Sequence, residues 1–153
     1  MKNQFLKKWK ISQDVMTLTV PAGCFREIRS ECIIRKPGHT GMNLVALWDT
    51  GCTDTHISQR IVDALKLEQY GIGRAANMVG YTVNNSYLVD IQLPFHRIIK
   101  NYEVYAGPLP GIDVIIGMDI IKYCDFSISN DGKGYCTCSI RYPSQGVIDY
   151  TEE

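Results

Sequence analysis

The chain has 153 residues, of which 45% are apolar, and its 16 basic side chains balance 16 acidic ones. This length provides one hydrophobic core but is short for two ordinary domains, so we expect a single globular unit. A formal net charge of zero gives no strong field to attract nucleic acid or an anionic membrane surface. Neither is therefore an expected partner.

No apolar stretch approaches the roughly 20 residues that span a bilayer, so no membrane-crossing segment is predicted. Residues 1–10 contain four lysines and only scattered apolar side chains, unlike a secretory signal. The simplest predicted location is the cytoplasm. In that reducing compartment the six cysteines are expected to be mostly free thiols.

Strand signals dominate the first third of the chain. Three short segments rich in β-branched or aromatic residues are separated by turn sequences with proline and glycine, and they span 15–20, 24–35 and 43–48. After Gly51 the apolar period becomes helical, with Ser58 as the expected N-cap. The residues on one face of this short helix are Ile57, Ile61, Val62 and Leu65.

Strand signals return in the second half. Residues 77–95 predict a long hairpin with its tip between Gly80 and Asn85. The remaining predicted elements are strands at 102–106 and 114–116, a helical turn at 119–123, and a hairpin that pairs 126–128 with 135–140. Many short strands with few helical residues indicate a mainly β, barrel-like fold.

The segment most informative about function is an apolar strand that stops at a tight turn. Leu44 to Trp48 is followed at once by Asp49-Thr50-Gly51, which places a carboxylate at the end of a buried strand, where a turn begins. Burial at such a position can shift a carboxylate pKa, as acid–base catalysis requires. Taken alone, the triplet is equally compatible with an ordinary turn in which the aspartate binds its own backbone.

The context of this triplet resembles the first signature of the retropepsin-like aspartic proteases. Residues 46–58 contain an apolar strand, Asp-Thr-Gly, small or hydroxyl residues and the start of a helix. About 60 residues later, 113–121 resembles the second signature, an apolar strand that ends at Gly117 and leads into a short helix. The resemblance covers roughly 15–142 and implies an acid-protease barrel whose hairpin, the flap, closes over a cleft.

The resemblance also implies how such a chain would work. Two-lobed pepsin-like enzymes carry two Asp-Thr/Ser-Gly loops, whereas this chain carries one, so a homodimer should complete the site. Two neighbouring carboxylates share one proton and titrate as a pair. One Asp49 would activate a water that attacks a peptide bond, and the protonated Asp49 of the other copy would polarise the carbonyl. Neither a metal nor a cofactor is required.

Supporting roles follow from the same resemblance. Thr50 would hydrogen-bond across the two-fold axis, and Gly51 would allow close approach of backbone and substrate. The candidate flap tip is Gly80, Tyr81 and Thr82, where an ordinary turn is the alternative.

Other residues in or near the signatures have simpler interpretations. Cys52 replaces the alanine, serine or threonine usual in the resembled proteins and is best explained as a small buried filler. Asp54 and Asp119 could brace the Asp49 turn, but capping of backbone groups is favoured for both. Residues 71–76 mimic a dinucleotide fingerprint but lack the apolar strand that should precede it. The three histidines show no triad spacing.

The predicted function is an aspartic endopeptidase that acts as a homodimer on peptide or protein substrates. Its protease domain is expected at 14–142, with a loosely ordered segment at 1–13 and a tail at 143–153. The alternative is a catalytically silent module of the same fold that dimerises or binds peptides. A metal or redox protein built on the six cysteines is a third possibility.

Overall fold

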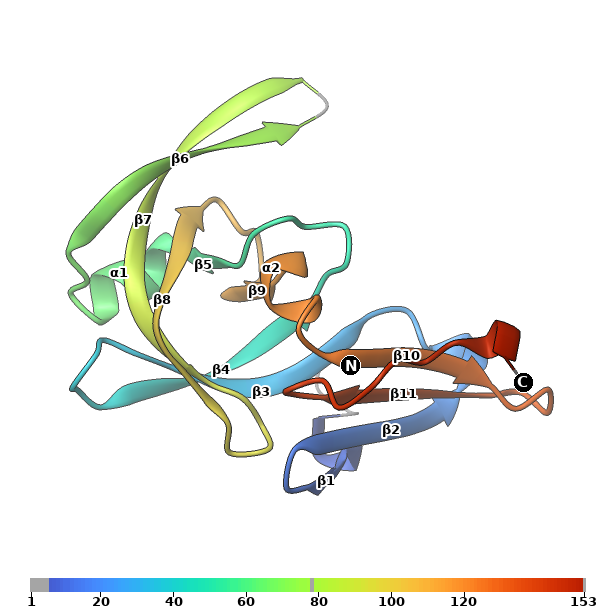
Figure 1. Cartoon of the computed structure of the whole chain (residues 1–153). Helices are drawn as coiled ribbons and strands as arrows, with labels where there is room; N and C mark the ends of the chain where they lie inside the picture. The colour runs from blue at the N-terminus through green and yellow to red at the C-terminus, as the bar shows by residue number, and fades with distance from the viewer. Residues whose placement is uncertain (1–5, 78, 153) are drawn as a thin grey trace.

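Two β-sheets and two short α-helices make up the described part of the chain, residues 6–77 and 79–152, in a computed structural model (Figure 1). The first sheet is antiparallel and has the strand order β1-β2-β11-β10. Its strands are Lys10–Ser12 (β1), Val15–Pro21 (β2), Asp125–Asn130 (β10) and Tyr135–Arg141 (β11).

The second sheet has the order β3-β4-β9-β5-β8-β7-β6, and an additional pairing of β3 with β7 closes six of its strands into a barrel. Only β6 stays outside this ring. The strands are Ile28–Arg35 (β3), Gly41–Trp48 (β4), His56–Ser58 (β5), Gln69–Asn77 (β6), Gly80–Gln92 (β7), Ile98–Gly107 (β8) and Val114–Ile116 (β9).

One helix follows the first predicted signature, and the other forms the end of the second. Helix α1 (Gln59–Ala64) continues directly from β5, and helix α2 (Met118–Ile121) begins after Gly117 at the end of β9. Strands β4 and β9 run in parallel, with Ala46 opposite Val114 and Trp48 opposite Ile116. The prediction of a mainly β barrel with two short helical elements is therefore confirmed.

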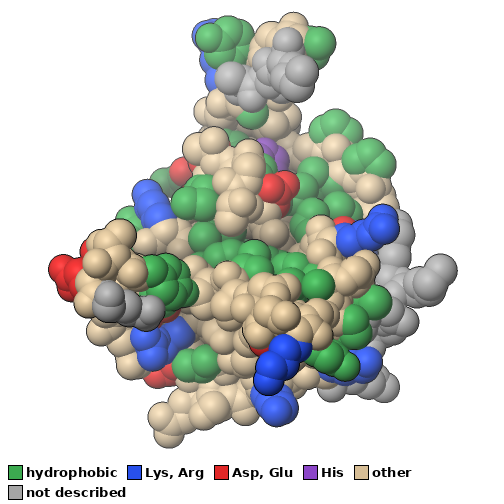
Figure 2. Space-filling model, turned by 90° about the vertical axis from the view of Figure 1, so that its right-hand side faces the viewer, with side chains coloured by type: hydrophobic (Ala, Val, Ile, Leu, Met, Phe, Trp, Pro, Cys, Tyr) green, Lys and Arg blue, Asp and Glu red, His purple; other side chains and the backbone are tan. Residues whose placement is uncertain are grey.

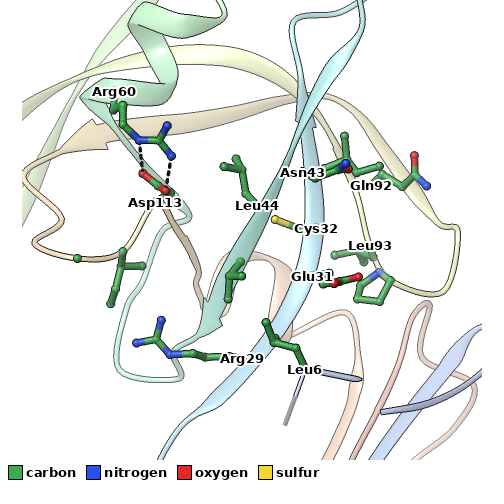
Figure 3. A pocket seen from close by; sticks show the side chains of 15 residues that line it. Leu6, Arg29, Glu31, Cys32, Asn43, Leu44, Arg60, Gln92, Leu93 and Asp113 are labelled. Atoms are coloured by element: carbon green, nitrogen blue, oxygen red, sulfur yellow. Dashed lines mark hydrogen bonds and ion pairs between the residues drawn. The ribbon is translucent and has the colours of Figure 1, made fainter. Parts of the chain in front are cut away.

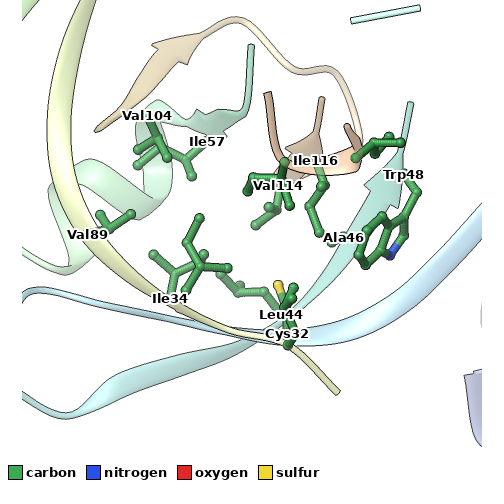
Figure 4. Packing of buried hydrophobic residues seen from close by; sticks show 14 of the residues in the cluster. Cys32, Ile34, Leu44, Ala46, Trp48, Ile57, Val89, Val104, Val114 and Ile116 are labelled. Carbon is green, nitrogen blue, oxygen red and sulfur yellow. The ribbon is translucent and has the colours of Figure 1, made fainter. Parts of the chain in front are cut away.

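The hydrophobic core fills the barrel because its strands alternate between two faces. On β4, Leu44, Ala46 and Trp48 are buried, whereas the residues between them are more exposed. The Trp48 indole N–H donates to Ser30 Oγ at 2.9 Å, which satisfies the only polar atom of that side chain. Figure 4 shows the strand residues that surround this row, including Ile34, Val89, Val104, Val114 and Ile116.

The flap hairpin lies earlier in the chain than the sequence suggested. Its strands are β6 and β7, and Asn77 pairs with Gly80, so the hairpin turns between these two residues instead of between Gly80 and Asn85. Met78 lies outside the described residues. Gly80 has a φ of 140°, a conformation that favours glycine. The predicted turn residues Asn84 and Asn85 are instead paired within the hairpin, opposite Gly73 and Ile72.

The N-terminal part of the described chain joins the first sheet through β1 and also contacts β3 of the second sheet. Residues 1–5 of the predicted loose segment 1–13 are outside the described residues, whereas 6–13 include a 3₁₀ turn (Leu6–Lys8) and β1. The Trp9 indole N–H donates to the Arg29 carbonyl at 2.8 Å. After β11 the tail ends in a 3₁₀ turn at Tyr150–Glu152. Neither helix of the described residues has the length or hydrophobicity to cross a membrane.

Candidate active site

Asp49 is the first residue after β4, and its backbone is fixed on both sides. Its N–H donates to the Ile116 carbonyl at 2.9 Å, and its carbonyl accepts from the Cys52 N–H at 3.2 Å. One carboxylate oxygen, Oδ1, accepts from the Gly51 N–H at 2.8 Å. The side chain is partly exposed. Asp49 therefore does hydrogen-bond to the backbone of its own turn, as in the ordinary-turn alternative. That bond uses only Oδ1, so Oδ2 can bind another group.

Residues 49–55, which we call the Asp49 loop, are held by the end of the second signature. The Met118 N–H donates to the Cys52 carbonyl at 2.7 Å, and the Asp119 N–H donates to the Thr53 carbonyl at 3.0 Å. These bonds form because Gly117 has no side chain, so its backbone can lie close to the Asp49 loop. A Cβ on that glycine would lie 2.6 Å from the Asp54 carbonyl oxygen and 2.8 Å from that of Cys52.

The Thr55 hydroxyl and the Asp119 carboxylate add further hydrogen bonds between the Asp49 loop and the second signature, and we call this set of bonds the brace. Thr55 donates its N–H to Asp119 Oδ2 at 3.0 Å and its Oγ1 hydrogen to Asp119 Oδ1 at 2.8 Å. The same Oγ1 accepts from the Gly117 N–H at 3.1 Å. Tyr102 on β8 donates its hydroxyl to Asp119 Oδ2 at 2.9 Å. Burial, and next the neighbouring Asp119 charge, raise the pKa of Tyr102, so it stays a donor.

This arrangement confirms backbone capping by Asp119 and adds the bracing role that was its alternative, whereas the capping prediction for Asp54 is wrong within the described residues. Asp119 does accept the N–H of Ile120 at 3.0 Å, but its main contacts brace the Asp49 loop. The Asp54 carboxylate forms no hydrogen bond within the described part of the chain; only its carbonyl is used. Thr55 and Tyr102 were missed, because no sequence spacing connects a threonine to a carboxylate 64 residues away.

The Cys52 thiol and the His56 ring are close but do not form a nucleophile–base pair. Cys52 Sγ lies 3.6 Å from His56 Nδ1 and 3.1 Å from the Asp54 carbonyl, and His56 Nδ1 lies 2.8 Å from that same carbonyl. A carbonyl only accepts, so Nδ1 carries a proton and cannot deprotonate the thiol. Burial raises the pKa of Cys52. The cysteine therefore contributes packing and local hydrogen bonding.

Comparison with solved structures identifies the architecture. EIAV protease in complex with the inhibitor HBY-793 is similar over 67% of this chain and 92% of its own, with a TM-score of 0.53 and 21% sequence identity. A retropepsin-like aspartic protease from Rickettsia conorii is similar over 85% of this chain and 95% of its own, with a TM-score of 0.52 and 12% identity. The chain has the retropepsin-like fold.

No protein-family model matches the chain, and no curated protein sequence does. At these sequence identities the structural similarity shows the fold, and the chemistry has to be argued from the residues. In this retropepsin-like fold, Thr50 and Gly51 are both exposed at the turn beside Asp49. The structure contains a single copy, so the bond of Thr50 across a two-fold axis stays a prediction.

The flap of the retropepsin-like fold projects above the Asp49 loop, at the top of Figures 1 and 2. Gly80, Tyr81 and Thr82, the candidate tip, form the start of β7 directly after the turn, and all three are exposed. Further along the hairpin, the backbone of Gly73 packs on the Tyr105 ring. A Cβ on Gly73 would lie 2.2 Å from Tyr105 Cε1. This glycine thus lets the flap rest closely on β8.

A groove runs along the outer face of β3 and β4 (Figure 3). Asn43 and Val45 line it, and by strand alternation they share a face with Leu47 and then with Asp49. Asp113 stands on its wall, accepting from Ser58 Oγ at 2.8 Å and from Arg60 Nε at 3.2 Å. The Arg60 hydrogen bonds lower the pKa of Asp113. Ser58, the predicted N-cap of α1, thus uses its hydroxyl to position Asp113.

Proposed function

We propose that this chain is an aspartic endopeptidase, and that Asp49 from each of two copies forms its catalytic pair. The observation that carries the proposal is the position of Asp49, at the end of a barrel strand and in a loop braced by the second signature. Asp49 is partly exposed, in the loop that follows β4. Within a retropepsin-like fold, this is a position suited to acid–base work on a bound peptide.

The chemistry needs two carboxyl groups in different protonation states. When the two groups approach closely, the second ionisation is unfavourable, so the pair keeps one proton. The ionised Asp49 accepts a proton from a water, which attacks the peptide carbonyl carbon. The protonated Asp49 donates to the carbonyl oxygen as negative charge develops there. The single chain supplies one of these groups, so the active form is a homodimer.

The hydrogen bonds that hold the Asp49 loop, and the flap, each have a role in this mechanism. Hydrogen bonds from the Gly51 N–H to Asp49 and from Thr55 to Asp119 limit the movement of the loop, which keeps the carboxylate oriented before the substrate arrives. The flap covers the bound peptide and excludes bulk water.

A peptide-library digest tests the proposal. The wild-type chain, Asp49→Asn and the control Asp63→Asn are incubated with the library at acidic and neutral pH, with and without a pepstatin-like inhibitor. We expect inhibitor-sensitive cleavage by the wild type and by Asp63→Asn, because Asp63 is an exposed residue of α1 that contacts Gln59. Cleavage by Asp49→Asn would contradict the assignment. Peptide binding without cleavage by any of the three would favour the silent module.

A further inference from the structure

One face of the seven-stranded sheet carries a row of side chains that starts beside Asp49. The members of this row are partners across the neighbouring strands β4, β9, β5 and β8, and we call them the floor: Leu47, Ile115, His56 and Tyr105. All four are partly exposed, whereas residues that alternate with them along the strands, such as Ala46 and Val104, are buried in the barrel. The floor therefore lies on the sheet face that points away from the core.

The flap covers the Tyr105 end of this floor. Gly73 on β6 pairs with Asn84 on β7, so these two residues lie on the same face of the hairpin. That face is turned towards Tyr105, because a Cβ on Gly73 would lie 2.2 Å from Tyr105 Cε1 and 2.9 Å from Tyr105 Cζ. The tyrosine ring therefore fills the space between the flap and this end of the floor.

Little room is left beside the Tyr105 ring. A cavity of about 10 Å³ lies between the flap and the end of the Asp49 loop, and its lining includes Asp54, His56, Gly73, Asn84 and Tyr105. This is about the volume that one water molecule needs. The groove on β3 and β4 is far larger, at about 870 Å³. A methyl group or a hydroxyl is comparable in size to a water, whereas the side chains of leucine and phenylalanine are several times larger.

The walls of this cavity are held in place by their own contacts. His56 Nδ1 donates to the Asp54 carbonyl at 2.8 Å, which fixes the histidine ring against the end of the Asp49 loop. The centroids of the His56 and Tyr105 rings are 6.0 Å apart, within the range of aromatic contacts. The Tyr105 ring thus has His56 on one side and the backbone of Gly73 on another. A larger group could enter only if the ring moved against both.

From these observations we propose that Tyr105 determines specificity, by restricting the peptide side chain that binds between the flap and His56 to a small one, such as that of alanine or serine. The inference rests on the proposed function, in which a peptide lies between the Asp49 loop and the flap. A homodimer has two such cavities, related by its two-fold axis. The restriction therefore applies at two positions of the peptide, on opposite sides of the cleaved bond and equally far from it.

Peptide libraries varied at one position at a time test the proposal. At one position on each side of the cleaved bond, we expect the kcat/KM of the wild type to be at least about tenfold higher for alanine or serine than for leucine or phenylalanine. Tyr105→Ala removes the ring and should reduce this ratio to less than about threefold. Tyr105→Phe keeps the ring and should keep the ratio. Tyr70→Ala is the matched control and should also keep it, because Tyr70 is an exposed tyrosine of β6 that does not line the cavity.

Binding of the same peptides to Asp49→Asn provides a readout that does not depend on cleavage, and the same preference for small residues should appear in the Kd. If Tyr105→Ala does not fold, Tyr105→Leu retains more packing and should still weaken the preference. A wild type without a size preference, or a Tyr105→Leu variant with the full wild-type preference, would overturn the inference. Size-selective binding without cleavage by the wild type contradicts only the proposed function. Cleavage without size selection contradicts only this inference, and a chain that binds no peptide contradicts both.

Discussion

Thr55 donates both its N–H and its hydroxyl hydrogen to the carboxylate of Asp119, at 3.0 and 2.8 Å. This pair of bonds connects the end of the Asp49 loop to the first turn of α2. Because Thr55 Oγ1 also accepts from the Gly117 N–H, the two signatures form one hydrogen-bonded unit. The Asp49 loop is therefore held by residues of the second signature as well as by its own turn.

Removal of the Asp119 carboxylate should loosen this unit. Asp119→Ala leaves the Thr55 and Tyr102 donors without their acceptor, and we expect a loss of about 3 kcal/mol in the free energy of unfolding. Tyr102→Phe removes only one of these bonds and should cost about 1 kcal/mol. Urea denaturation measures both. If the two variants lost equal stability, the brace would not depend on the Thr55–Asp119 bonds.

Gly117 should tolerate no side chain. In Gly117→Ala the new Cβ meets backbone atoms of Cys52 and Asp54, which cannot move without opening the Asp49 loop. We expect a loss of roughly 3 kcal/mol or more, together with loss of cleavage. Gly23→Ala is the control, because a Cβ at Gly23 has no atom within 4 Å. Equal thermal stability of the two variants, measured by circular dichroism, would contradict the close contact.

The contact between Gly73 and Tyr105 should couple the flap to the barrel. Gly73→Ala forces the Tyr105 ring to move, at a cost of about 1–3 kcal/mol. In a Tyr105→Ala background the obstacle is absent, so the same substitution should cost clearly less. Chemical denaturation of the two single variants and the double variant gives the coupling energy. Strictly additive costs would show that the ring and the flap glycine do not meet.

Stability at low pH should depend on Asp125, the first residue of β10. The Ser144 hydroxyl, then the Gln145 N–H and Arg141, lower its pKa from 3.8 to about 2. Since the folded pKa is below the unfolded one, the stabilisation is present above about pH 4 and is lost as the pH falls towards 2. Asp125→Asn should therefore lose less stability than the wild type over this interval. Parallel unfolding midpoints of the two proteins from pH 5 to pH 2 would contradict this role.

The sequence contained enough information to predict the barrel fold and to select Asp49 as the candidate catalytic residue. The apolar alternation of β4 and the glycine at position 117 are local patterns, and the structure places both next to the Asp49 loop. Helix α1 also lies where the apolar period changes, and α2 lies just after Gly117, close to the predicted helical turn. Each of these features depends on residues close together in the chain.

Features that depend on distant residues were not predictable in the same way. The first strand of the hairpin, β6, was not predicted, because its glycines and few apolar residues carry little strand signal. The turn was then placed too late in the chain. The Thr55–Asp119 brace follows from the order of the strands in the sheet, which a single sequence does not specify.

The most direct test of a shared active site is a mixing experiment. Increasing amounts of Asp49→Asn are added to a fixed amount of wild-type chain, and peptide cleavage is measured at equilibrium, with an unrelated protein as the control addition. A mixed dimer carries one carboxyl group and one amide and cannot share a proton between two carboxylates. Random exchange of copies then predicts that cleavage falls to about half when the two chains are equal in amount. Cleavage that stays constant as Asp49→Asn is added would contradict a site built from two copies.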